Sequence, residues 1–276
     1  MNRVKLSFLL FLCLTVLGCA PEPPEPTPSL PPQRIVSLVP SATELIFAVG
    51  QGDKVVGVTL NDNYPPEVRE LPRVGDQSVD LEKVLSLKPD LVVIDSGFNQ
   101  NKDDLTRLGL SVLELECRRL EDIPRSLRLL GEALGATSEG RRRAQEFEES
   151  LRSFPPVESD LKVLVEVWGE PLMTVGKETL LNDLILRLGL KNCYAQESGY
   201  FQVDPEDVVS RKPDLVILPV PPGQQTDSEA AKLIRRLGGK VAVLRVNSDH
   251  FVRAGPRLIE GLSELRAQLV EMERPK

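Results

Sequence analysis

The sequence predicts an α/β protein of two lobes, each a parallel-sheet α/β sandwich, bridged by one long helix. Residues 79 to 92, VDLEKVLSLKPDLV, return 124 positions later as VDPEDVVSRKPDLV at 203 to 216, with ten of fourteen positions identical. Strand and helix patterns alternate along both halves, as is typical of parallel sheets. A polar helix of the kind that often bridges domains separates the two halves.

The first half alternates from its start. We expect strands at 34–38, 54–58, 91–94 and 112–115, and helices at 42–49, 81–87, 102–108 and 121–134. Ser41 and Glu44 have the spacing of a capping box at the first helix. The glycine-containing turn at 50–53 ends that helix, and the loop 59–80 is long enough to be functional. Each repeat copy begins with an Asp before an apolar stretch, which predicts an N-cap, a short helix, a turn and a buried strand.

The second half follows a bridging helix at 138–153, in which Ala144, Phe147 and Leu151 form a thin apolar stripe. We expect strands at 162–167, 215–218 and 241–244, and helices at 179–188, 205–211, 228–237 and 256–271. The predicted boundaries are therefore 34–137 for the N-terminal lobe, 138–156 for the bridging segment and 157–276 for the C-terminal lobe. The 243 residues from 34 onward suffice for a substantial core.

The N-terminal residues predict export. Arg3 and Lys5 precede an apolar run from Leu6 to Leu17, which is too short to span a bilayer, since a spanning helix needs about 20 residues. We interpret 1–18 as a signal peptide that ends at Cys19 like a lipoprotein signal, with an ordinary signal peptide as the alternative. Proline-rich residues 19–33 then form an extended tether. The protein is expected to be lipid-anchored through Cys19 and to face the periplasm or cell exterior.

Composition argues against several classes of function. Without Arg3 and Lys5 the chain carries 32 basic and 41 acidic side chains, a net charge of −9 that disfavours nucleic-acid binding. With one histidine, and with Cys117 and Cys193 expected as free thiols, no transition-metal site is predicted. The glycines near residue 50 and at 176 lack the spacing of nucleotide-binding loops. The adjacent residues Ser248-Asp249-His250 cannot aim at one another as a catalytic triad does. We therefore expect no enzyme and no catalytic residue.

Other residues suggest binding. Glu82 and Glu206 occupy the same position of the two repeat copies; each alone would favour a helix dipole, but the pair suggests docking to basic residues of a partner. Trp168 follows a strand and Tyr200 precedes the second copy, where both core packing and a cleft position are plausible, because parallel sheets bind ligands beyond the carboxyl ends of their strands. Arg253 follows the last strand, and it either contacts ligand or solvates the next helix.

Longer segments carry a resemblance. RIVSLVPSATELIFAVGQGDKVVGVT, NYPPEV, LPRVGD, LEKVLSLKPDLVV, PLMTVGKETLLNDLI and SDHFVRAGPRL are similar to the vitamin B12 and ferric-siderophore periplasmic binding proteins of ABC importers. The B12-binding branch is most similar, through YPPE and PLMTVGKET. The resemblance implies a corrinoid held between the lobes and one glutamate per lobe, Glu82 and Glu206, offered to permease arginines. The predicted ligand-binding set is Tyr64, Trp168, Tyr200, Phe201, Asp249, His250, Phe251 and Arg253.

The resemblance also sets the expected function. We expect a monomeric substrate-binding lipoprotein that delivers cobalamin or a related corrinoid to an ABC permease and its ATPase, without a resident cofactor. Several tryptophans common in B12 binders are missing, and Asp95 and Ser96 stand at one such place, so the ligand stays open. One alternative is a ferric-siderophore or haem binder with His250 or Tyr64 near the metal and Arg253 on an anionic group. Another is a surface sensor module, whose glutamates need not dock on a permease. A single bridging helix predicts that the cleft needs little motion.

Overall fold

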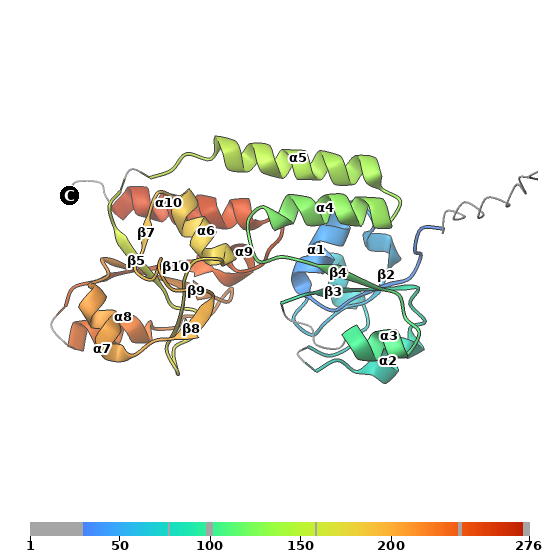
Figure 1. The fold of residues 1–276 in the computed structure, drawn as a ribbon, viewed down its shortest axis with the longest axis horizontal. Helices are drawn as coiled ribbons and strands as arrows, with labels where there is room; N and C mark the ends of the chain where they lie inside the picture. The colour runs from blue at the N-terminus through green and yellow to red at the C-terminus, as the bar shows by residue number, and fades with distance from the viewer. Residues whose placement is uncertain (1–29, 77, 98–101, 158, 237–238, 273–276) are drawn as a thin grey trace, which may run out of the picture. The chain divides into compact units, whose positions relative to one another are not determined.

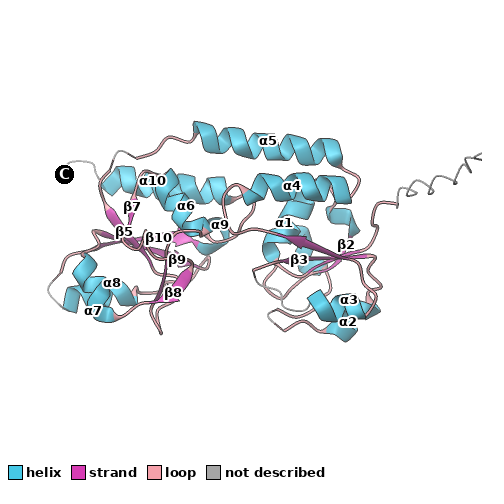
Figure 2. Ribbon diagram, viewed as in Figure 1, coloured by secondary structure: helices cyan, strands magenta, loops and turns pink. Residues whose placement is uncertain are grey.

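Two four-stranded parallel sheets form the framework of the protein in the computed structural model (Figures 1 and 2). The structure describes residues 30–76, 78–97, 102–157, 159–236 and 239–272. The predicted signal peptide, Cys19 and most of the predicted tether lie outside these ranges. From Pro31 onward the chain forms one unit by its internal contacts.

The two sheets have the same strand order. The first contains β1 (Ile35–Ser37), β2 (Val55–Gly57), β3 (Leu91–Asp95) and β4 (Val112–Leu115), in the order β2-β1-β3-β4. The second contains β5 (Lys162–Val165), β7 (Lys191–Asn192), β9 (Leu215–Val220) and β10 (Ala242–Asn247), in the order β7-β5-β9-β10. In each sheet the first strand is central, the second lies on one side and the last two lie on the other. The internal repeat in the sequence is therefore a repeat of topology.

Ten α-helices connect and cover these strands in the described ranges. Those of the first half are α1 (Pro40–Ala48), α2 (Leu81–Ser86), α3 (Lys102–Arg107), α4 (Asp122–Ala133) and α5 (Thr137–Ser153). Those of the second half are α6 (Leu180–Arg187), α7 (Pro205–Arg211), α8 (Glu229–Arg236), α9 (Ser248–Phe251) and α10 (Leu258–Met272). A short antiparallel pair, β6 (Met173–Val175) with β8 (Tyr200–Gln202), completes the second half. None of these helices combines the length and apolar character needed to cross a membrane.

Helices cover both faces of each sheet, as is usual for parallel sheets. Because successive strand residues point to opposite sides, each strand contributes side chains to both faces. In β3, Val92 and Ile94 join an apolar cluster with α2 and α3, whereas Leu91 and Val93 join a cluster with α1 and α4. Figure 1 shows these helix pairs on opposite sides of the first sheet. The second sheet repeats the arrangement, with α7 and α8 on one face and α6 and α10 on the other.

The repeated residues explain how each short helix leads into a central strand. Lys88 and Lys212 both adopt left-handed backbone, with φ of 49° and 52°. The carboxylates of Asp90 and Asp214 then accept the backbone N–H groups of Arg34 and Lys162, at 2.9 Å each, where the neighbouring strand begins. The same spacing in the two copies therefore places Asp90 and Asp214 where they fix the register of β1 against β3 and of β5 against β9.

The bridging helix α5 packs along α4 and also contacts α10. Of its predicted stripe residues, Ala144 and Phe147 are buried, and Leu151 is half-buried against the same apolar cluster. Gly140 permits the close approach of α4 and α5, since a Cβ there would lie 2.6 Å from the carbonyl oxygen of Leu127 and 2.8 Å from the Cα of Gly131. The largest apolar cluster runs from the first sheet through α4 and α5 to the second sheet, so one continuous core joins the lobes.

Some local expectations were wrong. The predicted capping box of Ser41 and Glu44 does not form: α1 begins at Pro40, its N-cap is Val39 without a side-chain cap, and both predicted residues lie buried inside the helix. The first helix does end at the predicted turn. There Gly50 (φ 73°) donates its N–H to Phe47, and Gln51 donates its N–H to Ile46, as in a Schellman motif. Asp80 caps α2 as predicted, whereas Asp204 makes no side-chain cap at α7. The strands β6, β7 and β8 and the helix α9 escaped prediction because each has at most four residues.

Candidate functional site

A cavity of about 1230 Å³ opens at the carboxyl ends of the strands of both sheets. The first half contributes the ends of β3 and β4 through Asp95, Gly97, Cys117 and Arg118. The second half contributes the residues after β5 and β9, the start of α6 and the region of α9. The carboxyl edge of a parallel sheet is the usual position of a ligand in open α/β folds. The volume exceeds that of most drug-sized pockets, which suits a large ligand.

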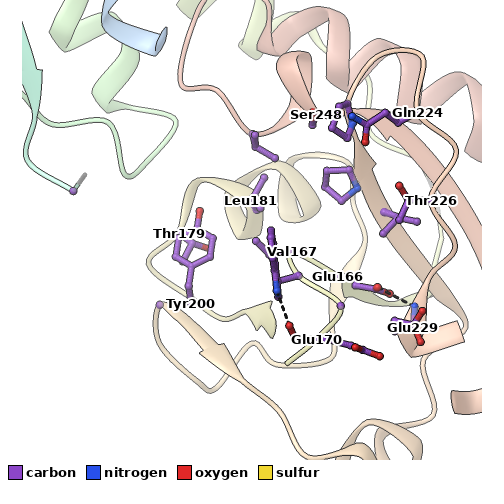
Figure 3. A pocket seen from close by; sticks show the side chains of 18 of the residues that line it. Glu166, Val167, Glu170, Thr179, Leu181, Tyr200, Gln224, Thr226, Glu229 and Ser248 are labelled. Carbon is purple, nitrogen blue, oxygen red and sulfur yellow. Dashed lines mark hydrogen bonds between the residues drawn. The ribbon is translucent and has the colours of Figure 1, made fainter. Parts of the chain in front are cut away.

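Two aromatic residues present their rings at this cavity. Trp168 is 62% exposed and Tyr200 50% exposed, although both are large apolar side chains. A hydrogen bond of 2.8 Å from the indole Nε1–H to the carbonyl oxygen of Glu170 fixes Trp168, and β8 supplies Tyr200. Figure 3 shows Tyr200 and Leu181 among the side chains around the hollow. Exposed, positioned aromatic rings are suited to stacking against a flat organic ligand.

The lining of the second half is held in place by Glu166. Its buried carboxylate accepts the hydroxyl of Ser228 and the backbone N–H of Ala230 (3.2 Å) where α8 begins. It also accepts the backbone N–H of Glu229 at 2.9 Å (Figure 3). This satisfies N–H groups that a helix start leaves without partners. The loop between β9 and α8, including Gln224 and Thr226, is therefore tied to the end of β5.

The lining of the first half centres on Asp95, which is 2% exposed. Its Oδ1 accepts the backbone N–H of Gly97 at 2.7 Å. Burial raises the pKa of Asp95 above its ordinary value, and burial together with the neighbouring Asp95 charge raises the pKa of the Cys117 thiol. Cys117 is thus a protonated, weakly reactive thiol at neutral pH. Neither cysteine of the described part forms a disulfide, in agreement with the sequence.

The predicted ligand-binding residues separate into two groups. Only Trp168 and Tyr200 line the large cavity. Phe201 instead packs edge-to-face on Tyr194 in an apolar cluster, with 5.5 Å between ring centroids, and Phe251 is fully buried in the core. His250 faces α10, where Glu264 lies 3.3 Å from its Nδ1 and Glu260 lies 3.7 Å from its Nε2.

The remaining predicted residues join the two lobes to each other. Arg253 bonds Asp249 at 2.9 Å, Asn63 at 2.7 Å and the Glu44 carboxylate at 3.3 Å, so it is already fully engaged in the protein. Tyr64 lies against the guanidinium of Arg257, 4.0 Å from its ring centroid. The structure therefore places Tyr64, Asp249 and Arg253 outside the cavity lining.

Glu44 is the centre of this interlobe contact. Its side chain is 1% exposed and accepts hydrogen bonds from both Arg253 and Arg257, including one of 2.9 Å from Nε of Arg257. A second interlobe contact joins the turn after β4 to α6, where Asp183 accepts hydrogen bonds from Nε of Arg119 at 2.7 Å and from the backbone N–H of Leu120 at 3.2 Å. The two lobes are therefore tied by specific ion pairs as well as by α5.

Glu82 and Glu206 are placed alike in the two lobes. Each lies in the first turn of its helix, α2 or α7, and each is exposed. Neither carboxylate is bonded to another residue of the described ranges. The matched positions and free carboxylates leave both glutamates accessible to a partner.

Sequence reasoning missed most polar residues of the cavity. Asp95 ends β3 and Cys117 lies two residues beyond the end of β4, positions that predict a site edge in hindsight, because the carboxyl ends of parallel strands meet there. Glu170, Glu178, Thr226 and Glu229 gave no comparable signal, since they lie in loops or at helix starts whose path the sequence does not reveal. Among the described residues, no group of three His, Cys, Asp or Glu side chains could hold a metal ion.

Comparison with known proteins finds relatives that are named as binding proteins. A vitamin B12-binding protein of Pectobacterium atrosepticum is 30% identical over 255 residues, which cover 88% of this chain and 90% of the relative. The ABC transporter substrate-binding lipoprotein YvrC of Bacillus subtilis, uncharacterized by its own description, is 35% identical over 254 residues, covering 85% and 79%.

Solved structures share the fold. The vitamin B12 binding protein BtuF of Vibrio cholerae superposes with a TM-score of 0.71 at 24% identity, covering 89% of this chain and all of the other. A periplasmic heme binding protein of Pseudomonas aeruginosa gives 0.75 at 24% identity, covering 89% and 95%. Residues 35–251 match the Periplasmic binding protein family. Because this match spans most of the chain, the protein belongs to the periplasmic binding protein family.

Proposed function

We propose that this protein is the substrate-binding component of an ABC importer, and that it captures cobalamin or a related corrinoid in the cavity between its lobes. The observation that carries the proposal is the cavity itself: about 1230 Å³ at the carboxyl ends of both sheets, with Trp168 and Tyr200 exposed at it. The relatives named for vitamin B12 binding support the same ligand class. Membership of a binding-protein family, rather than an enzyme family, supports a role in transport without catalysis.

Calorimetry with cyanocobalamin tests the ligand. We expect the purified full-length protein to bind it, and Trp168→Ala to weaken binding about tenfold to a hundredfold, because a stacked aromatic side chain typically dominates such contacts. Leu186→Ala is the matched control, since Leu186 is 54% exposed but lies outside the cavity lining. A protein that leaves cyanocobalamin unbound, or a Trp168 variant that binds as well as the control, rules the proposal out.

A haem or ferric-siderophore ligand is the alternative within the same class. It would place His250 or Tyr64 near the metal and Arg253 on an anionic group. All three residues are occupied by other contacts outside the cavity lining. Spectral titration with haem separates this alternative from a corrinoid.

The importer partner is proposed from Glu82 and Glu206. Two exposed carboxylates in matching first turns can form charge-assisted pairs with arginines of a permease. Uptake should be lost in the double variant Glu82→Lys, Glu206→Lys and retained when the exposed Glu70 and Glu271 are reversed instead. Normal uptake with both repeat glutamates reversed would favour a surface sensor over an importer component.

We also propose that a lipid on Cys19 anchors the protein to the membrane. Cys19 would carry the lipid after removal of residues 1–18, and the proline-rich segment would hold a monomeric binding unit near the membrane. Metabolic labelling with a fatty-acid analogue tests this, because Cys19→Ser should abolish labelling. Retained label in that variant would exclude Cys19 as the acylated residue.

A further inference from the structure

The charges that line the large cavity are strongly one-sided. Six carboxylates contribute to its lining, against the single guanidinium of Arg118, and the described lining includes neither histidine nor lysine. The six carboxylates belong to Asp95, Glu166, Glu170, Glu178, Asp227 and Glu229. The cavity is the site already proposed, so these charges bear on which ligands it accepts.

Two of these carboxylates are balanced from behind the lining. Lys232 bonds Glu229 at 2.7 Å and lies 3.8 Å from Asp227, and Arg245 lies 3.5 Å from Asp227. Counting both of these bases together with Arg118 still leaves an excess of three negative charges around the cavity. The excess is therefore a property of the whole site rather than of one side chain.

Glu170 and Glu178 are the carboxylates most available to a ligand. Both are exposed, and neither forms an ion pair with another residue of the described ranges. The backbone carbonyl of Glu170 accepts the indole N–H of Trp168. Lys177, the neighbour of Glu178, accepts the backbone N–H of Gly199, the neighbour of Tyr200, at 3.0 Å. The carboxylate oxygens of the two glutamates can only accept hydrogen bonds, so they favour a ligand that presents N–H groups.

The neutral polar residues of the lining fit the same kind of ligand. Gln224, Thr226, Thr179 and Ser248 line the cavity with amide and hydroxyl groups (Figure 3). Of these, Thr179 already donates its hydroxyl to the carbonyl of Gly176. A flat ring that carries amide side chains matches both the aromatic surfaces and these polar groups. A ring that carries carboxylates would meet acceptors and negative charge, which costs free energy in a site partly shielded from water.

We propose that the cavity selects its ligand by charge, accepting neutral or cationic amide-bearing rings and rejecting rings of similar size that carry carboxylates. This rests on the proposed corrinoid-binding function and narrows it: amide-bearing corrinoids are accepted, whereas haem, with its two propionates, and anionic siderophores are disfavoured. Glu170 and Glu178 are the specificity-determining residues. An excess of about three charges at roughly 10 Å gives about a tenfold change in affinity per unit of ligand charge at low salt, and a smaller change at physiological salt.

A series of corrinoids with one ring and different charge tests the proposal. Aquacobalamin is cationic, cyanocobalamin is neutral, and a cyanocobalamin monocarboxylate made by hydrolysis of one ring amide is anionic. Calorimetry of the full-length protein at low and at physiological salt gives three dissociation constants at each ionic strength. Because Cys117 lines the cavity, the series is repeated with Cys117→Ala, so that any contact between sulfur and cobalt is excluded as the source of the difference.

The expected result is a dissociation constant that rises about tenfold with each added negative charge at low salt, with a slope that flattens as salt is added. Glu170→Gln combined with Glu178→Gln should reduce this slope, whereas Glu82→Gln combined with Glu206→Gln, outside the lining, should leave it unchanged. Equal affinity for all three corrinoids would overturn charge selection while leaving corrinoid binding intact. Absence of binding by all three would instead overturn the proposed function. Unaltered charge dependence in the Glu170 and Glu178 double variant would remove their assigned role.

Discussion

Replacing Glu44 by glutamine should be among the most damaging conservative changes in the protein. The Glu44 side chain is 1% exposed, and its carboxylate is shared by Arg257 and Arg253, whose side chains are 11% and 14% exposed. Glu44 belongs to α1 of the first lobe, and both arginines belong to the segment around α9 and α10 of the second. The substitution keeps the shape of the side chain and removes its charge. It therefore tests the ion pair rather than the packing.

The expected cost follows from what each arginine retains. Removing one partner of a buried ion pair costs about 3–5 kcal/mol, because the other charge stays buried without compensation. Arg253 keeps Asp249, and Arg257 keeps the face of the Tyr64 ring, so we expect the lower end, about 3 kcal/mol. With a urea m-value of about 3 kcal/mol/M for a chain of this size, the unfolding midpoint should fall by about 1 M.

Glu139→Gln is the matched control. Glu139 also accepts hydrogen bonds from two arginines, Arg142 and Arg143, but it lies on the exposed face of α5 with 31% of its side chain accessible. Exposed pairs of this kind contribute about 0–1 kcal/mol. The assay is urea unfolding of the full-length variants followed by circular dichroism. Equal midpoints for Glu44→Gln and Glu139→Gln would refute the reasoning that burial makes the interlobe pair valuable.

Three further outcomes are expected from the same unfolding assay. Gly140→Ala should lower the free energy of unfolding by about 1–3 kcal/mol, because the added Cβ meets the backbone of α4. Gln145→Ala, on the exposed face of α5, should change it by less than about 0.5 kcal/mol. Equal effects would show that the two helices can separate at little cost. Burial raises the folded-state pKa of Asp95, so ionisation of this carboxyl lowers the free energy of unfolding above that pKa, and the loss disappears as the pH falls to the ordinary value of 3.8. Asp95→Asn should therefore be at least as stable as the natural protein at pH 7 and have no advantage near pH 4. A stability difference that does not change with pH would contradict this. Asp183→Ala should lower the free energy of unfolding by about 1–2 kcal/mol, because the Asp183 carboxylate is 11% exposed and also accepts the Leu120 N–H. Arg119→Gln should lower it by less, because the Arg119 side chain is 37% exposed. The reverse ranking would contradict this account.

The framework could be predicted from the sequence because its signals are local. The match between 79–92 and 203–216 predicted two equivalent helix–strand units, and both occupy the same place in sheets of the same strand order. Apolar runs such as LVVID at 91–95 are buried on both faces, as continuous apolar strands of parallel sheets are. These patterns involve residues that are close in sequence, so the helices and strands can be predicted from them without knowledge of the tertiary structure.

The site was less predictable because its contacts join distant residues. Glu44 was assigned to a capping box from a spacing of three residues, whereas its partners lie more than 200 positions away. His250, Phe251 and Arg253 follow a strand as cavity residues do, but the short helix α9 directs them to α10, the core and Glu44. Trp168 and Tyr200 were expected at a cleft from their places near a strand and the second repeat copy, and both line the cavity. The antiparallel pairing of β6 with β8, which supplies Tyr200, was not expected because these strands have only three residues each.

The repeat and the cavity lining therefore determine different properties of this protein: the repeat sets the framework, and the lining sets the ligand site. The repeated residues set helix starts, strand register and the two exposed glutamates, and all of these are nearly the same in both halves. The cavity lining comes from segments that the repeat does not contain, and these segments differ: the first half offers Asp95, Cys117 and Arg118, while the second half offers the aromatic rings and most of the carboxylates. The repeat thus accounts for the two similarly placed glutamates, whereas the cavity lining depends on the unrepeated loops. Substitutions at Glu170 or Glu178 should consequently change which ring is bound without changing how the protein meets its partner.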